Sequence, residues 1–527
     1  MRNITLIFLA SASVLASCTG REYLEWNTPA SGEEGFSHDM IVLGEKLPDP
    51  YSVDNMTKAL GAVYPASSGR TTIEPTDFYV RFLPRTEAQM QKLEDLGLEL
   101  LDHPLDHRII REGDWYHDPS IPEGELTWQY AVVPVAFEFP KDIRYERLDD
   151  CFLAEHAPST RADGIDWEAV ERESFRLTGN GDMLESATRG GESAVPQGRI
   201  AIVDPDYSEE PIGVKGVKVC CNSFVKFAVC YTDGEGWFRM SRSFSGNPRY
   251  RLIFKNIRGF SQGINAILVP ASVSTFGEQP ASGFSIDVDC WSDRKLFLRC
   301  AVNNAGYDYI DASRKSSGAI PAPPKDLRIW NCDFFETELN TMMHHGVLVE
   351  TMASLADMPK ECAMIIKVVQ PDMLLGMDGT ESYRDVYGRA IHAFAHAGHF
   401  ARTDKEWWWS YLQASAMSMA TSLLANPYGD RGDTGFEYVE IAEMYAFYCQ
   451  NVLMQRRYPS ITDYAGTTYW FAPQLLMYLD ERGLGLEKLA PIFTSDVTDL
   501  ETLRAKLLSY YPHFKTVINE AYARYQR

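Results

Sequence analysis

The spacing of apolar residues changes along the chain, and this change most constrains the fold. From Gly198 to about residue 290, short apolar runs and alternating apolar and polar residues indicate β-strands. After Tyr383 the apolar residues recur three or four positions apart, which is typical of helices packed on one face. Because the two patterns occupy separate stretches, the sequence predicts a multidomain α+β protein.

Length and charge narrow the classes further. The chain has 527 residues, which corresponds to three or four domains at about 150 residues each. Apolar residues make up 45% and charged residues 23%, so a wholly disordered chain, a collagen and a multispan membrane protein are excluded. Lys and Arg number 50 against 73 Asp and Glu, a net charge of −23. Such a surface repels phosphate backbones, so we do not expect a nucleic-acid partner.

The first segment predicts export and anchoring. After a short basic start, Ile4–Leu15 is mostly apolar but too short to span a bilayer, as in a secretion signal. It ends in Leu-Ala-Ser-Cys, which resembles the lipobox of bacterial lipoproteins. The resemblance implies a signal peptide over 1–17, a lipid anchor on Cys18 and a tether over 18–49. The alternative is an ordinary signal peptide with an incidental cysteine.

Residues 50–157 are expected to form a small α+β domain, followed by a linker over 158–196. A capping box at Thr86–Gln89 predicts the start of a short helix. The strands predicted in this region are Thr76–Leu83, Leu98–Leu101 and Tyr130–Val135.

Residues 197–290 are rich in strand and turn signals. A G-V-x-V run at Gly216–Val219 is followed by T-D-x-x-G-x-F at Thr232–Phe238. This combination resembles carboxypeptidase-regulatory-like domains, which are transthyretin-like β-sandwiches. The resemblance implies a module for spacing or packing.

Residues 291–527 are predicted to be mixed at first and then mainly helical. The expected strands are Leu327–Trp330 and Ala363–Val369. A capping box at Thr403–Glu406 predicts one helix, and Thr498–Glu501 predicts another near the end. Between them, a polar loop ending at Gly435 precedes a helix through about Gln455.

Three histidines within eight residues form the main candidate for chemistry. His392, His396 and His399 are four and three positions apart, so a helix places them on one face. Imidazoles one turn apart can share a Zn²⁺ ion. Another element can approach this helix closely, because the neighbouring residues are small: Ala393, Ala395, Ala397 and Gly398.

Glu443 is the candidate third ligand. It lies 47 residues after His396, in a helix otherwise rich in apolar residues. A carboxylate in such a helix needs a partner. The alternative for the histidines is a polar cluster at a helix interface that holds no metal.

The motif His392-x-x-x-His396 with Ala-Glu443-x-x-Ala resembles gluzincin metallopeptidases, whose motif is H-E-x-x-H with a glutamate on the following helix. More closely, the chain resembles secreted bacterial lipoproteins with a zincin-like peptidase domain, whose metal helix reads H-E-L-A-H-A-S-H. The resemblance covers most of the chain. It implies a zincin-like domain over 291–527, with His392, His396 and Glu443 as zinc ligands.

The chain departs from that family at the catalytic base. The glutamate after the first histidine is Ala393 here, and alanine cannot move a proton. General acid–base assistance contributes about 10²–10⁴-fold to a rate. The sequence therefore predicts an outer-membrane lipoprotein that binds zinc and acts as a pseudo-peptidase or binding protein for a peptide, protein or glycan. The alternative is an active but atypical zinc metallopeptidase that uses another base, such as Glu440.

Overall fold

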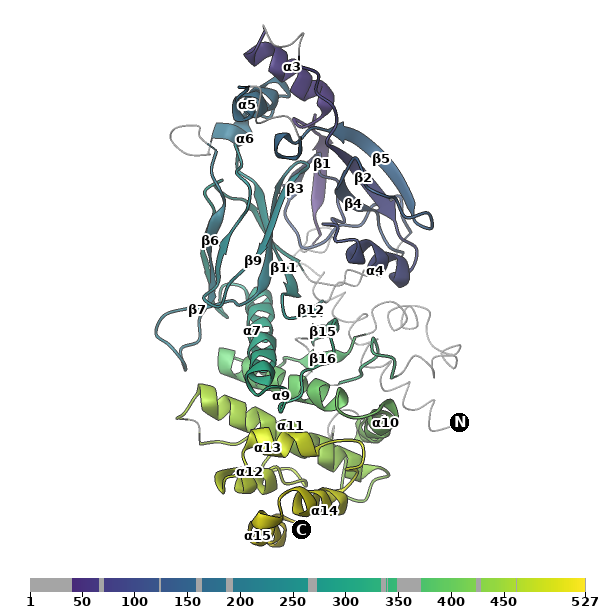
Figure 1. Ribbon diagram of the computed structural model, residues 1–527, viewed down its shortest axis with the longest axis vertical. Helices are drawn as coiled ribbons and strands as arrows, with labels where there is room; N and C mark the ends of the chain where they lie inside the picture. The colour runs from purple at the N-terminus through teal and green to yellow at the C-terminus, as the bar shows by residue number, and fades with distance from the viewer. Residues whose placement is uncertain are drawn as a thin grey trace, which may run out of the picture.

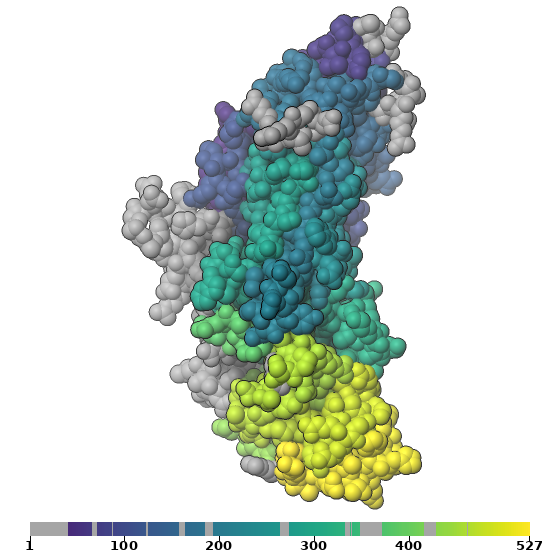
Figure 2. Space-filling model, turned by 90° about the vertical axis from the view of Figure 1, so that its left-hand side faces the viewer, coloured from purple at the N-terminus to yellow at the C-terminus, as the bar shows by residue number. Residues whose placement is uncertain are grey.

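The computed structural model is a mixed α+β protein, as the sequence predicts. It describes residues 40–65, 71–122, 125–157, 164–185, 193–263, 273–332, 338, 340–347, 371–422, 428–460 and 462–526. The molecule is elongated, with the N-terminal region at one end, the sheets in the middle and the C-terminal helices at the other end (Figures 1 and 2). Among the described residues, no helix is both long and apolar enough to span a bilayer.

The N-terminal region contains two small antiparallel sheets, β1–β3 and β4–β2–β5. Its helix α4 begins as predicted, because the Thr86 side chain accepts a hydrogen bond from the Gln89 backbone. The predicted strand Leu98–Leu101 is wrong: only Leu101 pairs, in an isolated bridge with Tyr130. The elements are β1 (Val42–Lys46), α3 (Val53–Val63), β2 (Asp77–Leu83), α4 (Glu87–Asp95), β3 (His107–Arg111), β4 (Gln129–Pro134), β5 (Arg144–Cys151), η1 (Ala154–His156), α5 (Trp167–Leu177) and α6 (Asp182–Glu185).

The middle of the chain forms two sheets that enclose a shared core. One has the order β10–β6–β14 with β7 on β6, and the other has the order β16–β15–β12–β11–β8–β9 with β13 on β11. Alternate residues Val217, Val219 and Cys221 on β8 point into the core between the sheets. The strands are β6 (Gln197–Ile202), β7 (Ile212–Gly213), β8 (Val217–Ser223), β9 (Lys226–Tyr231), β10 (Trp237–Arg239), β11 (Arg249–Asn256), β12 (Phe260–Gln262), β13 (Val273–Glu278) and β14 (Ile286–Val288).

The larger sheet continues across residue 290, the predicted boundary between the region 197–290 and the region 291–527. β15 (Leu327–Cys332) pairs in parallel with β12, and β16 (Met373–Gly376) pairs in parallel with β15. The long helix α7 (Arg294–Lys315) extends from the sheets toward the C-terminal helices (Figure 1). One hydrophobic core therefore joins the sheets to the helices.

The C-terminal part is helical, and two of its helices begin within one residue of the predicted capping boxes, with Asp404 and Asp499 as caps in place of Thr403 and Thr498. Asp404 accepts a hydrogen bond from the Trp407 backbone at the start of α10, and Asp499 forms a capping box with Thr502 at the start of α14. The elements are α9 (Tyr383–Phe400), α10 (Lys405–Ser422), α11 (Phe436–Arg457), α12 (Gln474–Glu481), α13 (Leu486–Leu489), η3 (Ala490–Ile492), α14 (Leu500–Tyr510), η4 (Pro512–Phe514) and α15 (Lys515–Tyr525).

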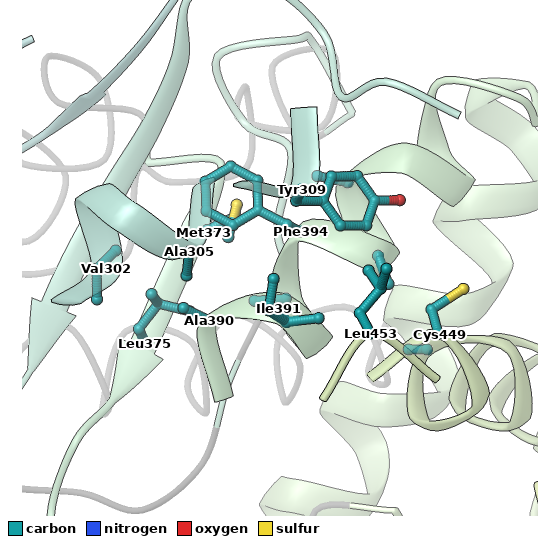
Figure 3. Close-up of a cluster of buried hydrophobic side chains, with 14 of the residues drawn as sticks. Val302, Ala305, Tyr309, Met373, Leu375, Ala390, Ile391, Phe394, Cys449 and Leu453 are labelled. Carbon is teal, nitrogen blue, oxygen red and sulfur yellow. The ribbon is translucent and has the colours of Figure 1, made fainter. Parts of the chain in front are cut away.

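Helix α9 is buried on nearly all sides because α7 and α11 pack against it. Side chains from α7, α9, α11 and β16 meet in one apolar cluster (Figure 3). The predicted close approach to the small residues of α9 is confirmed at Gly398. A Cβ atom there would lie 2.5 Å from both the Pro321 carbonyl oxygen and the Tyr309 hydroxyl.

Two predicted features lie outside the described residues: the N-terminal segment with Cys18, and the strand Ala363–Val369. Among the described residues, seven cysteines are free thiols, and none forms a disulfide.

Candidate metal centre

Helix α9 brings His392 and His396 together. It begins at a capping box formed by Ser382 and Asp385 and runs without a break through both histidines. Because they are four residues apart, their rings lie on the same face, and their Nε2 atoms are 3.1 Å apart. The two histidines are only 2% and 1% exposed, so their polar atoms need partners within the protein.

Glu443 on the neighbouring helix α11 supplies the third donor. Its Oε2 atom lies 3.3 Å from Nε2 of His392 and 3.4 Å from Nε2 of His396. We call these three residues the triad. A tetrahedral zinc ion with bonds of about 2.0–2.1 Å would hold its donors about 3.3–3.4 Å apart. The three separations in the protein, 3.1, 3.3 and 3.4 Å, are close to that value.

The hydrogen bonding of Glu443 also fits a metal ligand. Its Oε1 atom accepts a hydrogen bond of 2.8 Å from the hydroxyl of Tyr411, whose ring stacks on His396. Its Oε2 atom, which faces the two imidazoles, is buried and has no hydrogen-bond donor among the described residues. A tyrosine that fixes one carboxylate oxygen and leaves the other toward the histidines is the type of outer contact that orients metal ligands.

The outer contacts of the histidines are less complete. In zinc proteins the second ring nitrogen of a histidine ligand usually donates to an acceptor. Here the Nδ1 atoms of His392 and His396 have no hydrogen-bond partner in the described part of the chain. Gln450 is one of the groups that raise the pKa of His392.

Burial and charge oppose each other in the triad. Burial raises the pKa of Glu443, but the two imidazoles outweigh it and hold this pKa well below its usual range. Burial lowers the pKa of both histidines. At His392 the charges of Glu338 and Glu443 more than compensate, so its pKa is raised. At His396 the charge of Glu443 does not compensate for burial, so its pKa is lowered. The triad therefore favours an ionised carboxylate, the form that binds a cation.

His399 does not join the triad, although the sequence places it on the same helical face. Its ring packs against Trp407, Tyr445 and Phe493, with centroid separations of 4.6, 5.1 and 5.9 Å. Burial in this aromatic enclosure lowers the pKa of His399 to about 3, and the neighbouring His396 adds to the effect. Neither ring nitrogen has a hydrogen-bond partner among the described residues.

The structure does not bring Glu440 to the triad. Its Oε1 atom accepts a hydrogen bond of 2.8 Å from Arg431, which lies in the loop before α11. Burial raises the pKa of Glu440, and the charge of Arg431 lowers it in part. Ala393, which directly follows the first histidine of the motif, is fully buried and belongs to the hydrophobic core.

Sequence reasoning missed one acidic residue, Glu338. It follows β15, and its Oε2 atom lies 3.8 Å from Nε2 of His392. Its side chain is 13% exposed, and burial raises its pKa while the charges of His392 and Arg389 lower it in part. No spacing or motif marks this residue, because it is more than fifty positions from the histidines and only the chain topology brings it near them.

An aromatic wall borders the two carboxylates. Tyr428 and Tyr469 pack against each other with ring centroids 4.6 Å apart. Burial raises the pKa of both tyrosines, and the negative charges of Glu338 and Glu443 raise it further. Tyr469 is 45% exposed, whereas the triad residues are almost completely buried.

The triad can hold a divalent cation. Each of its three residues offers one ligand atom, and these atoms all lie within 4.8 Å of one another. Comparison with protein-family models, curated proteins and solved structures finds no match to this chain. The assignment of a metal centre therefore rests on the residues and distances given above.

Proposed function

We propose that this chain is a zinc-binding lipoprotein of the bacterial cell envelope, anchored in the outer membrane, whose zincin-like domain binds a peptide, protein or glycan without cleaving it. The observation that carries the proposal is the convergence of three buried donor atoms from two helices at the separations of a tetrahedral metal site. Two imidazoles and a carboxylate are a ligand set that suits zinc.

The residues around the triad support binding rather than hydrolysis. When bound in such a site, zinc acts as a Lewis acid and lowers the pKa of a coordinated water molecule. Cleavage also needs a group that moves a proton. Ala393 cannot do this, and Glu440 is held by Arg431. The donor atoms lie in the core, whereas a catalytic metal keeps one position open to water and substrate.

Metal analysis of the purified full-length protein tests the proposal. We expect close to one zinc per chain in the wild type and little or none in His392→Ala, His396→Ala and Glu443→Ala. Glu440→Gln is the matched control, because it removes a buried carboxylate from the same helix α11 without touching the triad. If the wild type and His392→Ala carry the same amount of zinc, the site does not exist.

The absence of hydrolysis is tested on the same preparations. The wild type is incubated with a broad peptide library, with and without a chelator, and we expect no chelator-sensitive cleavage. Cleavage that the chelator abolishes and that is lost in His396→Ala would refute the pseudo-peptidase interpretation.

The anchor is tested separately in cells. The lipobox resemblance at Leu15–Cys18 leads us to expect acyl labelling and membrane fractionation of the wild type. Cys18→Ala should lose the label and leave the protein unprocessed or soluble. An unlabelled wild type that fractionates like Cys18→Ala would contradict the lipid anchor.

A further inference from the structure

Glu338 is a second buried carboxylate beside the triad. Its Oε2 atom lies 3.8 Å from Nε2 of His392, the same ring nitrogen that Glu443 contacts at 3.3 Å. The segment that carries it follows β15, whereas the triad comes from α9 and α11. Three separate parts of the chain thus direct polar groups to one point.

The charges of these groups call for a cation. Two carboxylates near two imidazoles carry a net charge of −2 when both imidazoles are neutral. A buried charge that is not balanced is costly, and two buried carboxylates also repel each other. One divalent cation balances the two carboxylates completely.

Glu338 lies beside the triad on the side of His392. Three donors leave one corner of a tetrahedron open. Glu338 Oε2 is about 0.5 Å farther from His392 Nε2 than a fourth tetrahedral donor would be, since such donors lie about 3.3 Å apart. Glu338 does not belong to the triad, whose ligand atoms all lie within 4.8 Å of one another. Its side chain has three rotatable bonds, so the carboxylate can move toward the triad without a change in the backbone.

We propose that Glu338 is the fourth protein ligand of the metal, which makes the centre a closed, structural His₂Glu₂ site. This inference rests on the proposed zinc binding by the triad. Structural zinc sites have four protein donors, whereas catalytic sites keep one position for water or substrate. With Glu338 bound, the metal links the segment after β15 to helices α9 and α11 and has no position for a substrate. The closed site and the loss of the catalytic glutamate at Ala393 then have a common explanation.

Zinc affinity of the full-length protein tests this ligand. Competition with a chromophoric chelator should show that Glu338→Gln binds zinc more than about 100-fold more weakly than the wild type, since loss of an outer contact alone costs about 10–100-fold. Glu338→His should recover most of the affinity, because imidazole is a zinc donor. Glu440→Gln should bind like the wild type.

Cobalt absorption gives a second readout that does not depend on activity. Cobalt(II) in place of zinc should show the intense visible bands of a four-coordinate site in the wild type and in Glu338→His. These bands should weaken and shift in Glu338→Gln, because water replaces a carboxylate. Far-UV circular dichroism of each metal-free variant shows that the fold is retained, and Glu338→His keeps the test valid if Glu338→Gln does not fold.

The outcomes separate the two proposals. If the wild type binds zinc no better than His392→Ala, the triad itself fails. If the wild type binds zinc tightly, but Glu338→Gln matches its affinity within 10-fold and keeps its cobalt spectrum, the triad stands and Glu338 is not a ligand. Unchanged affinity together with a loss of peptide cleavage in Glu338→Gln would also overturn the ligand assignment and would make Glu338 a catalytic base.

Discussion

The substitution Gly398→Ala should destabilise the helix that carries His392 and His396, against the usual preference for alanine in helices. Alanine is favoured over glycine by about 1 kcal/mol in a helix interior. At Gly398, however, the new Cβ atom would lie 2.5 Å from the Pro321 carbonyl oxygen and 2.5 Å from the Tyr309 hydroxyl. One of these atoms belongs to the backbone, so neither a rotamer change nor a small side-chain movement removes both contacts.

The magnitude follows from these two contacts. Inserting a methyl group into a well-packed core costs about 1–3 kcal/mol. The Tyr309 hydroxyl also donates to the Pro321 carbonyl at 3.1 Å, and loss of that buried hydrogen bond costs about 1 kcal/mol. After the helix preference of about 1 kcal/mol is subtracted, we expect a net destabilisation of about 1–3 kcal/mol.

Gly388→Ala is the matched control, because it makes the same change in the same helix. Its Cβ atom would meet the Gln450 Nε2 atom at 3.2 Å and the Met454 Cε atom at 3.3 Å, which are the ends of flexible side chains. We therefore expect its stability to be unchanged or raised by up to about 1 kcal/mol. Urea unfolding followed by circular dichroism and tryptophan fluorescence measures both variants with metal removed by a chelator.

Two results would contradict this prediction: a Gly398→Ala variant as stable as the wild type, or a Gly388→Ala variant that loses as much stability. Either result would mean that helix α9 is not held against Tyr309 and Pro321 as the structure shows.

Three further predictions concern the metal ligands, the aromatic enclosure and the dependence of stability on pH. Tyr411→Phe removes the hydroxyl that donates to Glu443, so zinc affinity should fall about 10–100-fold while one zinc still binds at saturation. Unchanged affinity in a chelator competition would show that the tyrosine does not orient the carboxylate. His399→Leu removes two buried nitrogens that have no hydrogen-bond partner among the described residues, so zinc content should be retained and stability should not fall. A loss of zinc as large as that in His396→Ala would make His399 a ligand. Burial, with a contribution from neighbouring carboxylates, raises the pKa of Asp49 to about 8. The folded state therefore holds a proton that the unfolded state releases above about pH 4, and stability should be lost as pH rises from about 4 to 8, by up to about 1.4 kcal/mol per unit. Asp49→Asn should flatten this part of the curve and be more stable than the wild type at pH 8; parallel curves for the two proteins in urea unfolding would contradict the assignment.

The sequence was most informative where structure depends on neighbouring residues. Thr86 caps its helix as predicted, because a cap needs only a side chain and a backbone amide two or three residues later. The caps at Asp404 and Asp499 lie one residue after the start of the predicted capping boxes. His392 and His396 share a helical face for the same local reason.

Glu443 was identified without local geometry. A carboxylate inside an apolar helix needs a partner, and the family resemblance directed attention to the same residue. The structure brings it to the two histidines, at 3.3 and 3.4 Å. The three residues meet because α9 packs against α11. The sequence indicated only that their side chains are of the types that bind a metal.

Tertiary structure decided which of the remaining polar residues take part. His399 lies on the predicted face, but the aromatic rings of other helices enclose it. Glu440 lies one turn from Glu443, but Arg431 holds it elsewhere. Glu338 has no motif and reaches His392 only because the chain returns to it after β15. The pairing of β15 with β12 across the expected domain boundary has the same origin. Periodicity and capping depend on residues a few positions apart, so they predict helices and strands, whereas contacts between distant segments depend on how those elements pack.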